Sequence, residues 1–142
     1  MGNYHYIIAG LPELVLNADN KSFSYDAVRE SIYYSSDEKD RRLIEWFDFG
    51  TSEENLTSHF YRAAFRNRSR FIRHWFALDL EIRNRKVDFV AGKMGRDASQ
   101  YKVATECNVD LGLTEEQLQK LSGIFANKNI LEKEQLLDKF KW

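Results

Sequence analysis

The amino-acid sequence predicts an all-α fold: a helical bundle with one long central helix, in a single domain over residues 1–142. Residues that break helices are scarce, because the chain holds one Pro and seven Gly. Hydrophobic residues make up 43% of the 142 positions, which supplies enough apolar side chains for a core. A Ser or Thr followed three positions later by Glu or Gln recurs along the chain, and this spacing is typical of helix N-termini.

The chain opens with an aromatic stretch that fits two conformations. Residues 4–9 are compatible with a strand or with a first helical turn, and Gly10 and Pro12 end the stretch. Residues 16–22 are polar and indicate a loop. The longest apolar run near the N-terminus, residues 7–11, is too short for a signal sequence or a membrane-spanning helix.

Two helices are expected in the following segment. Ser24 or Asp26 is a suitable cap for a helix that runs to about residue 34. Ser35 and Glu38 then have the spacing of a capping box, which predicts that a second helix starts there. This second helix is expected to end at Gly50, since Gly is common directly after a helix.

The longest helical region is expected over residues 53–94, and Thr51 and Glu54 repeat the capping-box spacing at its start. The region contains no Pro and one Gly, although the polar stretch at residues 66–70 predicts a break. The longest single helix is therefore expected within residues 69–94.

The C-terminal segment predicts two more helices. Thr114 and Gln117 have capping-box spacing, and residues 130–142 form an amphipathic pattern that reaches the end of the sequence without a stop signal. This pattern predicts the N-terminal part of a longer protein. The apolar side chains of the last helix require cover, from the chain's own core or from a second copy in a homodimer: Ile130, Leu131, Leu137, Phe140 and Trp142.

The charge balance and the cysteine content indicate which partners and which redox compartment the protein is suited to. Lys and Arg number 21 against 22 Asp and Glu, so a net charge of −1 gives the whole molecule no strong attraction for nucleic acid or an anionic membrane. Any basic binding site must therefore be local. Cys107 is the single cysteine and cannot form an internal disulfide, which fits a reducing, cytoplasmic compartment.

Motifs for catalysis and cofactor binding are absent from the sequence. It contains no glycine-rich nucleotide-binding pattern, no HExxH zinc pattern and no GxSxG nucleophile pattern. His5, His59 and His74 share no metal-ligand spacing with one another or with Cys107. We therefore expect no cofactor, no metal site and no catalytic residue, in a protein that is not an enzyme.

Four arginines are expected to form a stripe on one helix. On a helical wheel they fall within a sector of about 80°, opposite the neighbouring aromatic and aliphatic residues. They are Arg62, Arg66, Arg70 and Arg73. Three interpretations stand: a solvated face paired with nearby acids, a surface for an anionic protein partner, and a surface for nucleic acid. The first is preferred, and nucleic acid is least favoured because the net charge is near zero.

A carboxylate, Asp79, falls among the apolar residues of the same wheel, where burial without a partner would be costly. Arg83 follows one turn later, so a packed ion pair is favoured over a catalytic acid, which would need a second carboxylate at a suitable spacing. The polar residues Asn84, Arg85 and Lys86 complete the interruption of this apolar helix. They are expected to meet solvent or another chain.

Several stretches together resemble a known family. "NYHYIIAGLPEL", "ALDLEIRNRKVDFVAGKMG", and "NVDLGL" followed by "ILEKEQLLDKFKW" resemble an uncharacterised bacterial domain family akin to the C subunit of V-type/A-type rotary ATPases, called d in eukaryotes. In that wider family a long helix carries an acidic residue, an aliphatic one, any residue, Asn, a basic segment and Gly. The matching positions here are Glu81, Ile82, Arg83, Asn84, Lys86, Lys93 and Gly95. The sequence departs from the pattern at Arg85, Val90 and Gly92.

The resemblance implies a helical, funnel-like subunit without cofactor or chemistry. Such a subunit sits at the cytoplasmic side of the membrane, held there by protein contacts, and links the membrane ring to the central rotor shaft. The expected partners are these other ATPase subunits and no nucleic acid. The arginine stripe, with Asn84, Arg85 and Lys86, is the expected partner surface. The alternative is a helical nucleic-acid-binding protein that uses the arginine stripe.

Overall fold

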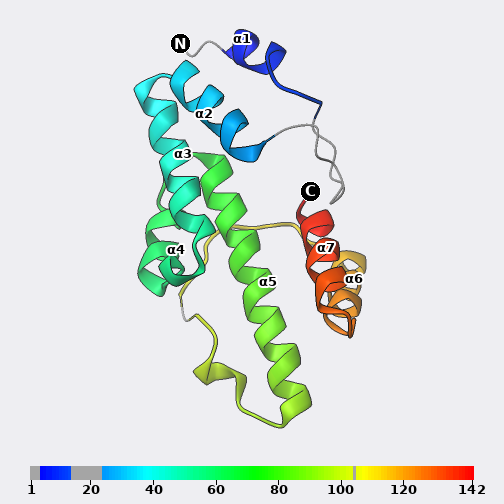
Figure 1. Ribbon diagram of the computed structural model, residues 1–142. Helices are drawn as coiled ribbons and strands as arrows, with labels where there is room; N and C mark the ends of the chain where they lie inside the picture. Colours follow the sequence, from blue (N-terminus) through cyan, green and yellow to red (C-terminus); the bar gives the residue numbers. More distant parts are fainter. Residues whose placement is uncertain (1–3, 14–23, 104) are drawn as a thin grey trace. The chain divides into compact units, whose positions relative to one another are not determined.

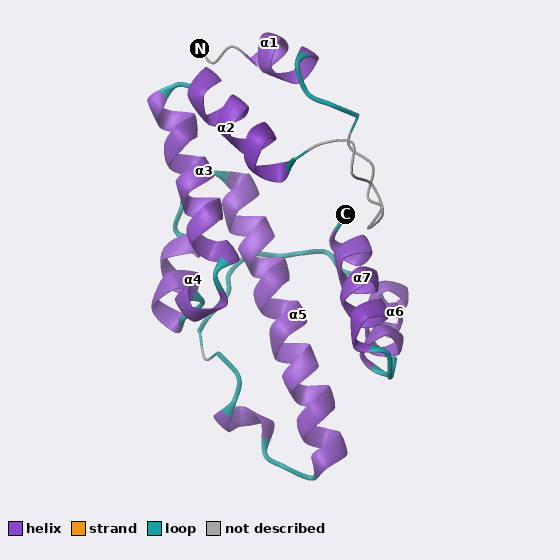
Figure 2. Ribbon diagram, viewed as in Figure 1, coloured by secondary structure: helices purple, strands orange, loops and turns teal. Residues whose placement is uncertain are grey.

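The protein is all-α in the part that its computed structural model describes, residues 4–13, 24–103 and 105–142 (Figures 1 and 2). This part contains helices and no strand, which confirms the predicted fold class. The chain divides into two compact units, Met1–Ser52 and Glu53–Trp142. Each unit is described by itself, and the single domain expected over the whole chain stays a prediction. The loop predicted at residues 16–22 lies outside the described residues.

The first unit contains α1 (Tyr4–Ala9), α2 (Tyr25–Ser35) and α3 (Glu38–Thr51). The opening aromatic stretch is thus a helix rather than a strand. The side chain of Ser24 caps α2, as one of the two predicted candidates. None of the hydrophobic side chains described in this unit is fully buried.

Polar side chains hold the helices of the first unit together. Arg29 of α2 forms an ion pair with Asp48 of α3, and the Tyr33 hydroxyl donates to Glu45 Oε1 over 2.8 Å. Tyr4 of α1 donates to Asp40 Oδ2, also over 2.8 Å. The helices of this unit are therefore joined by charged and phenolic groups, and not by a hydrophobic core of fully buried side chains.

The predicted capping box at Ser35 and Glu38 is wrong. Ser35 is the last residue of α2, and Asp37 caps α3 by accepting a hydrogen bond from the Asp40 backbone N–H over 2.9 Å. The extended backbone that separates the helices falls at Ser36, with φ −92° and ψ 154°, so the cap lies two residues later than predicted. The helix also continues through Gly50, where an end was expected, and closes at Thr51.

The second unit contains the long helix α5 (Arg70–Met94), which confirms the expectation of the longest helix within residues 69–94. Before it come a 3₁₀ turn, η1 (Glu53–Asn55), and α4 (Ser58–Phe65). After it come a second 3₁₀ turn, η2 (Ala98–Gln100), and the pair α6 (Glu115–Phe125) and α7 (Ile130–Lys141). The helices α6 and α7 pack on each other, as Figure 1 shows, and α6 also contacts α5.

Capping side chains set most of these boundaries. Thr114 and Gln117 form the predicted capping box at the start of α6. Thr57, and not Thr51, caps the next helix after α3, because Thr51 is itself the last residue of α3. Asn67 Oδ1 accepts from the Ser69 N–H over 2.8 Å, and Ser69 then caps α5, which produces the break expected at residues 66–70.

Two apolar clusters hold the second unit together. Phe60 of α4 meets Phe76 of α5 edge to face, with ring centroids 4.9 Å apart. Further along α5, Ile82 packs against α6 and α7 in a cluster of buried residues: Ile82, Leu121, Ile124, Phe125 and Leu137. The apolar side of α7 therefore folds back on the chain's own core through Leu137, one of the two covers expected from the sequence. None of the described helices is long and apolar enough to cross a membrane.

Candidate functional site

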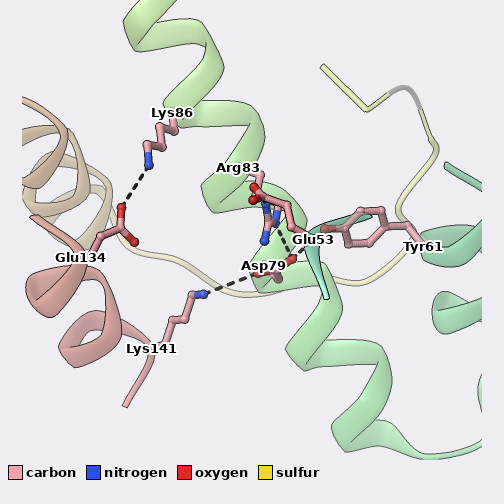
Figure 3. Close-up of polar contacts among 7 residues, drawn as sticks. All are labelled: Glu53, Tyr61, Asp79, Arg83, Lys86, Glu134 and Lys141. Carbon is pink, nitrogen blue, oxygen red and sulfur yellow. Dashed lines mark hydrogen bonds and ion pairs between the residues drawn. The ribbon is translucent and has the colours of Figure 1, made fainter. Parts of the chain in front are cut away.

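The middle of α5 carries a nearly buried carboxylate, Asp79, which is 9% exposed and has three donors around it. The Tyr61 hydroxyl donates to Asp79 Oδ2 over 2.6 Å, and Arg83 Nε donates to the same oxygen over 2.9 Å. Lys141 Nζ lies 3.5 Å from Oδ1. Figure 3 shows Tyr61 and Lys141 approaching Asp79 from opposite sides. The pair of Asp79 and Arg83 is the one that the helical spacing predicts.

Each donor reaches Asp79 from a different element. Tyr61 comes from α4, Arg83 from the next turn of α5, and Lys141 from the last turn of α7. Arg83 continues the network to η1, since its Nη1 lies 3.1 Å from Glu53 Oε1. One buried carboxylate therefore ties together four elements of the second unit.

The pKa values of two donors in this Asp79 network, Tyr61 and Arg83, are shifted by their surroundings. Burial, together with the hydrogen bond to Asp79, raises the pKa of Tyr61 well above its usual value of 10, so the phenol stays a neutral donor. Burial alone would lower the pKa of Arg83, but the charge of Asp79 and its hydrogen bond raise it. A carboxylate whose donors all come from the protein is suited to bracing helices.

The other polar residues that interrupt α5 also have partners within the chain. Asn84 Nδ2 donates to the Val103 carbonyl over 3.4 Å and Asn84 Oδ1 accepts from the Val103 N–H over 3.2 Å, so this side chain holds the segment after η2. Lys86 Nζ lies 3.2 Å from Glu134 Oε1 of α7. Arg85 Nε contacts Glu81 Oε1 on its own helix over 2.5 Å. Of the three residues expected to face solvent or another chain, Arg85 alone pairs only within its own helix.

The arginine stripe is not a single helical face, which corrects the prediction. The break at residues 67–69 divides the four residues: Arg62 lies on α4, Arg66 is the C-cap of α4, and Arg70 starts α5. Arg73 turns back to the break, where its Nη1 donates to the carbonyls of Asn67 and Arg68 over 2.7 and 3.0 Å. The wheel assumed one continuous helix, and the turn at Asn67 redirects the chain.

Arg62 and Arg66 line an open basic groove of about 730 Å³. Phe65 supplies its floor from α4, and the segment that precedes α6 closes the other side with Thr105, Glu106 and Asn108. Two exposed guanidinium groups one helical turn apart outnumber the single carboxylate of Glu106 in the groove, so they are suited to binding carboxylates of a partner. We refer to this feature as the Arg62 groove.

Sequence reasoning missed several residues of these sites. Tyr61 and Lys141 are separated from Asp79 by 18 and 62 positions, and no local spacing connects them. Glu53 and Glu134 are likewise distant from the residues that they bind. The one available signal was that Asp79 required a partner. Among the described residues, no group of three His, Cys, Asp or Glu is placed to hold a metal ion.

Comparison with known proteins gives a match to a protein family. The model of a family described as "protein of unknown function (DUF2764)" matches residues 48–142. This segment takes in the whole second unit, with the Asp79 network and the Arg62 groove. No curated protein and no solved structure matches the chain.

Proposed function

Because the chain belongs to the DUF2764 family, whose description states no function, we propose a function from the geometry of the second unit and the sequence resemblance. The protein is a non-catalytic coupling subunit of a V-type/A-type rotary ATPase. It links the central rotor shaft to the membrane ring during ATP-driven or ion-driven rotation. It works at the cytoplasmic side of the membrane and is held there by protein contacts.

The bracing of the central part of α5 is the observation that carries the proposal. One of the stretches that resemble the rotary subunits, residues 77–95, covers the middle and the end of this helix, where Arg83, Asn84 and Lys86 each bind a different part of the chain. A part that transmits torque needs helices that do not slide or bend, and buried polar networks with satisfied partners rigidify a fold. The braced segment therefore suits a mechanical role.

The Arg62 groove is the proposed contact surface for an acidic partner. Arginine is favoured in protein interfaces because its planar group binds carboxylates at two points and stacks on other side chains. Arg62 and Arg66 are exposed on the groove, and Arg70 is exposed just beyond the break. We no longer include Asn84 and Lys86 in the proposed contact surface, because their partners lie within the chain.

Co-expression with the shaft and ring subunits encoded in the same genome tests the proposal. We expect the chain to co-purify with the shaft subunit, and the double change Arg62→Glu and Arg66→Glu to weaken this association at least tenfold by reversing the charge of the groove. Arg42→Glu is the matched control, since Arg42 lies on the exposed surface of α3 and pairs with Glu38. Membrane vesicles that lack the chain should hydrolyse ATP without pumping ions.

The alternative is a helical nucleic-acid-binding protein that uses the same arginines. The broken stripe supplies fewer aligned cations than the sequence predicted, so non-specific binding is expected to be weak and to vanish as salt is raised. Sequence-selective binding of duplex or single-stranded nucleic acid at physiological salt, without any association with ATPase subunits, would overturn the proposed function.

A further inference from the structure

A second, apolar groove lies along the C-terminal half of α5. It has a volume of about 330 Å³ and is lined by α5 and the segment that leads through η2. Its lining residues are Lys86, Val87, Val90, Ala91, Met94, Arg96 and Tyr101. Val90, Met94 and Tyr101 are large hydrophobic residues that stay exposed here. We call this feature the α5 groove; it has an apolar floor and cations at its ends.

The first turn of α7 presents exposed apolar side chains. Ile130 and Leu131 are 76% and 69% exposed, among the highest values for hydrophobic side chains in the described residues. The sequence predicted an apolar seam along the whole helix, but Leu137 and Phe140 pack inward on the core. Trp142 at the other end of the helix also stays exposed, and the two aliphatic side chains of the first turn, Ile130 and Leu131, form a projection that we call the α7 tip.

The α5 groove and the α7 tip are neighbours in one chain. Lys86 lines the groove and also binds Glu134, which follows Ile130 by one helical turn. Arg96 lies at the groove, and Glu132 lies beside Leu131 on the tip. An exposed apolar projection near an apolar groove, with Glu132 beside the one and Arg96 beside the other, allows reciprocal contacts between two copies related by a two-fold axis.

We propose that the α5 groove binds the α7 tip of a second copy of this chain, so that two copies form a reciprocal dimer. Ile130 and Leu131 of each copy fill the groove of the other, and Glu132 meets Arg96 across the interface. Burial of these exposed aliphatic side chains drives the association, and the charge pair sets its register. This inference is independent of the proposed coupling function, because it concerns the chain before or without assembly.

Light scattering of the full chain over a concentration series tests the dimer. Val90→Asp in the groove and Leu131→Asp on the tip should each weaken dimerisation at least tenfold, because each places a charge in a desolvated contact. Ile8→Asp is the control, since Ile8 is an aliphatic residue of the first unit with an exposure close to that of Leu131. All three positions are exposed, so circular dichroism should show unchanged helix content.

Charge exchange tests the register of the two copies. Arg96→Glu and Glu132→Arg should each weaken the dimer, and the double variant should recover most of the loss by restoring opposite charges across the interface. A chain that stays monomeric at every concentration overturns the proposal. So does a dimer that responds to only one of Val90→Asp and Leu131→Asp, or growth into open-ended assemblies in place of a dimer.

Discussion

Asp79 shows at the scale of single residues how one buried charge organises this protein. Its carboxylate accepts from Tyr61 and Arg83 and faces Lys141. We expect Asp79→Asn to lower the free energy of unfolding by about 2 kcal/mol, less than for a fully buried pair because both cations keep some contact with water. Arg85→Gln removes only an exposed pair with Glu81 and should change it by less than about 0.5 kcal/mol. Urea unfolding measures both; equal losses would contradict the central role of Asp79.

Tyr61 gives the network a measurable pH dependence. Its pKa in the folded protein is raised above the usual value of 10, first by burial and then by the hydrogen bond to Asp79. The folded state therefore holds the phenolic proton more tightly than the unfolded state, so the stabilisation is complete below pH 10 and is lost as the pH rises above 10. Tyr61→Phe should cost about 1 kcal/mol at pH 7 and reduce the loss of stability between pH 10 and 11. An unchanged slope in that range would contradict the assignment.

At the scale of elements, the C-terminal end of α5 depends on one backbone conformation. Gly95 has φ 64°, in the left-handed region that closes the helix, whereas Gly92 lies in the ordinary helical part. An added Cβ meets nothing within 4 Å at either position, so backbone preference alone decides the outcome. Gly95→Ala should destabilise the protein by about 1 kcal/mol, and Gly92→Ala should stabilise it by about 0.5 kcal/mol. Thermal unfolding of the two variants should shift in opposite directions; shifts of the same sign would contradict this account.

Helix boundaries were predictable where one capping residue stands alone. Thr114 with Gln117 has no competitor nearby, and the capping box forms as predicted. The capping box predicted at Ser35 was wrong because Asp37 lies two positions later and has the extended backbone of a cap. The capping role predicted for Thr51 was wrong because α3 extends as far as this residue. The choice between adjacent caps depends on where the preceding helix loses its packing, which local spacing does not encode.

Only the contact within a single helix of the Asp79 network could be predicted from the sequence. The pair of Asp79 and Arg83 follows from the i, i+4 spacing, and the structure contains it. The contacts of Asn84 and Lys86 come from segments that tertiary folding brings close, so the sequence assigned these side chains to solvent or a partner. The prediction of the arginine stripe was wrong for a related reason. A turn at Asn67 separates Arg62 and Arg66 from Arg70 and Arg73, so the four residues do not lie on one helix.

At the scale of the whole molecule, the buried apolar side chains are distributed unequally. Every fully buried hydrophobic residue that the structure describes lies between Phe60 and Leu137, within the second unit. The first unit relies on ion pairs and hydrogen bonds such as those of Arg29 and Tyr33. Partly exposed polar contacts contribute little to stability, whereas burial of apolar side chains drives folding. The second unit therefore holds most of the stabilising free energy.

This distribution predicts different behaviour for two fragments of the chain. Residues 48–142, which the family match spans, should be helical and unfold cooperatively, because they retain both apolar clusters and the Asp79 network. Residues 1–52 should show little helix in isolation, since short helices without a core are marginal in water. Circular dichroism with thermal melting measures both, and Leu121→Asp in the longer fragment is the control that removes a fully buried contact. A longer fragment that is unfolded, or a shorter fragment that melts cooperatively, would contradict this distribution. Either result would mean that the first unit contributes a hydrophobic core of its own.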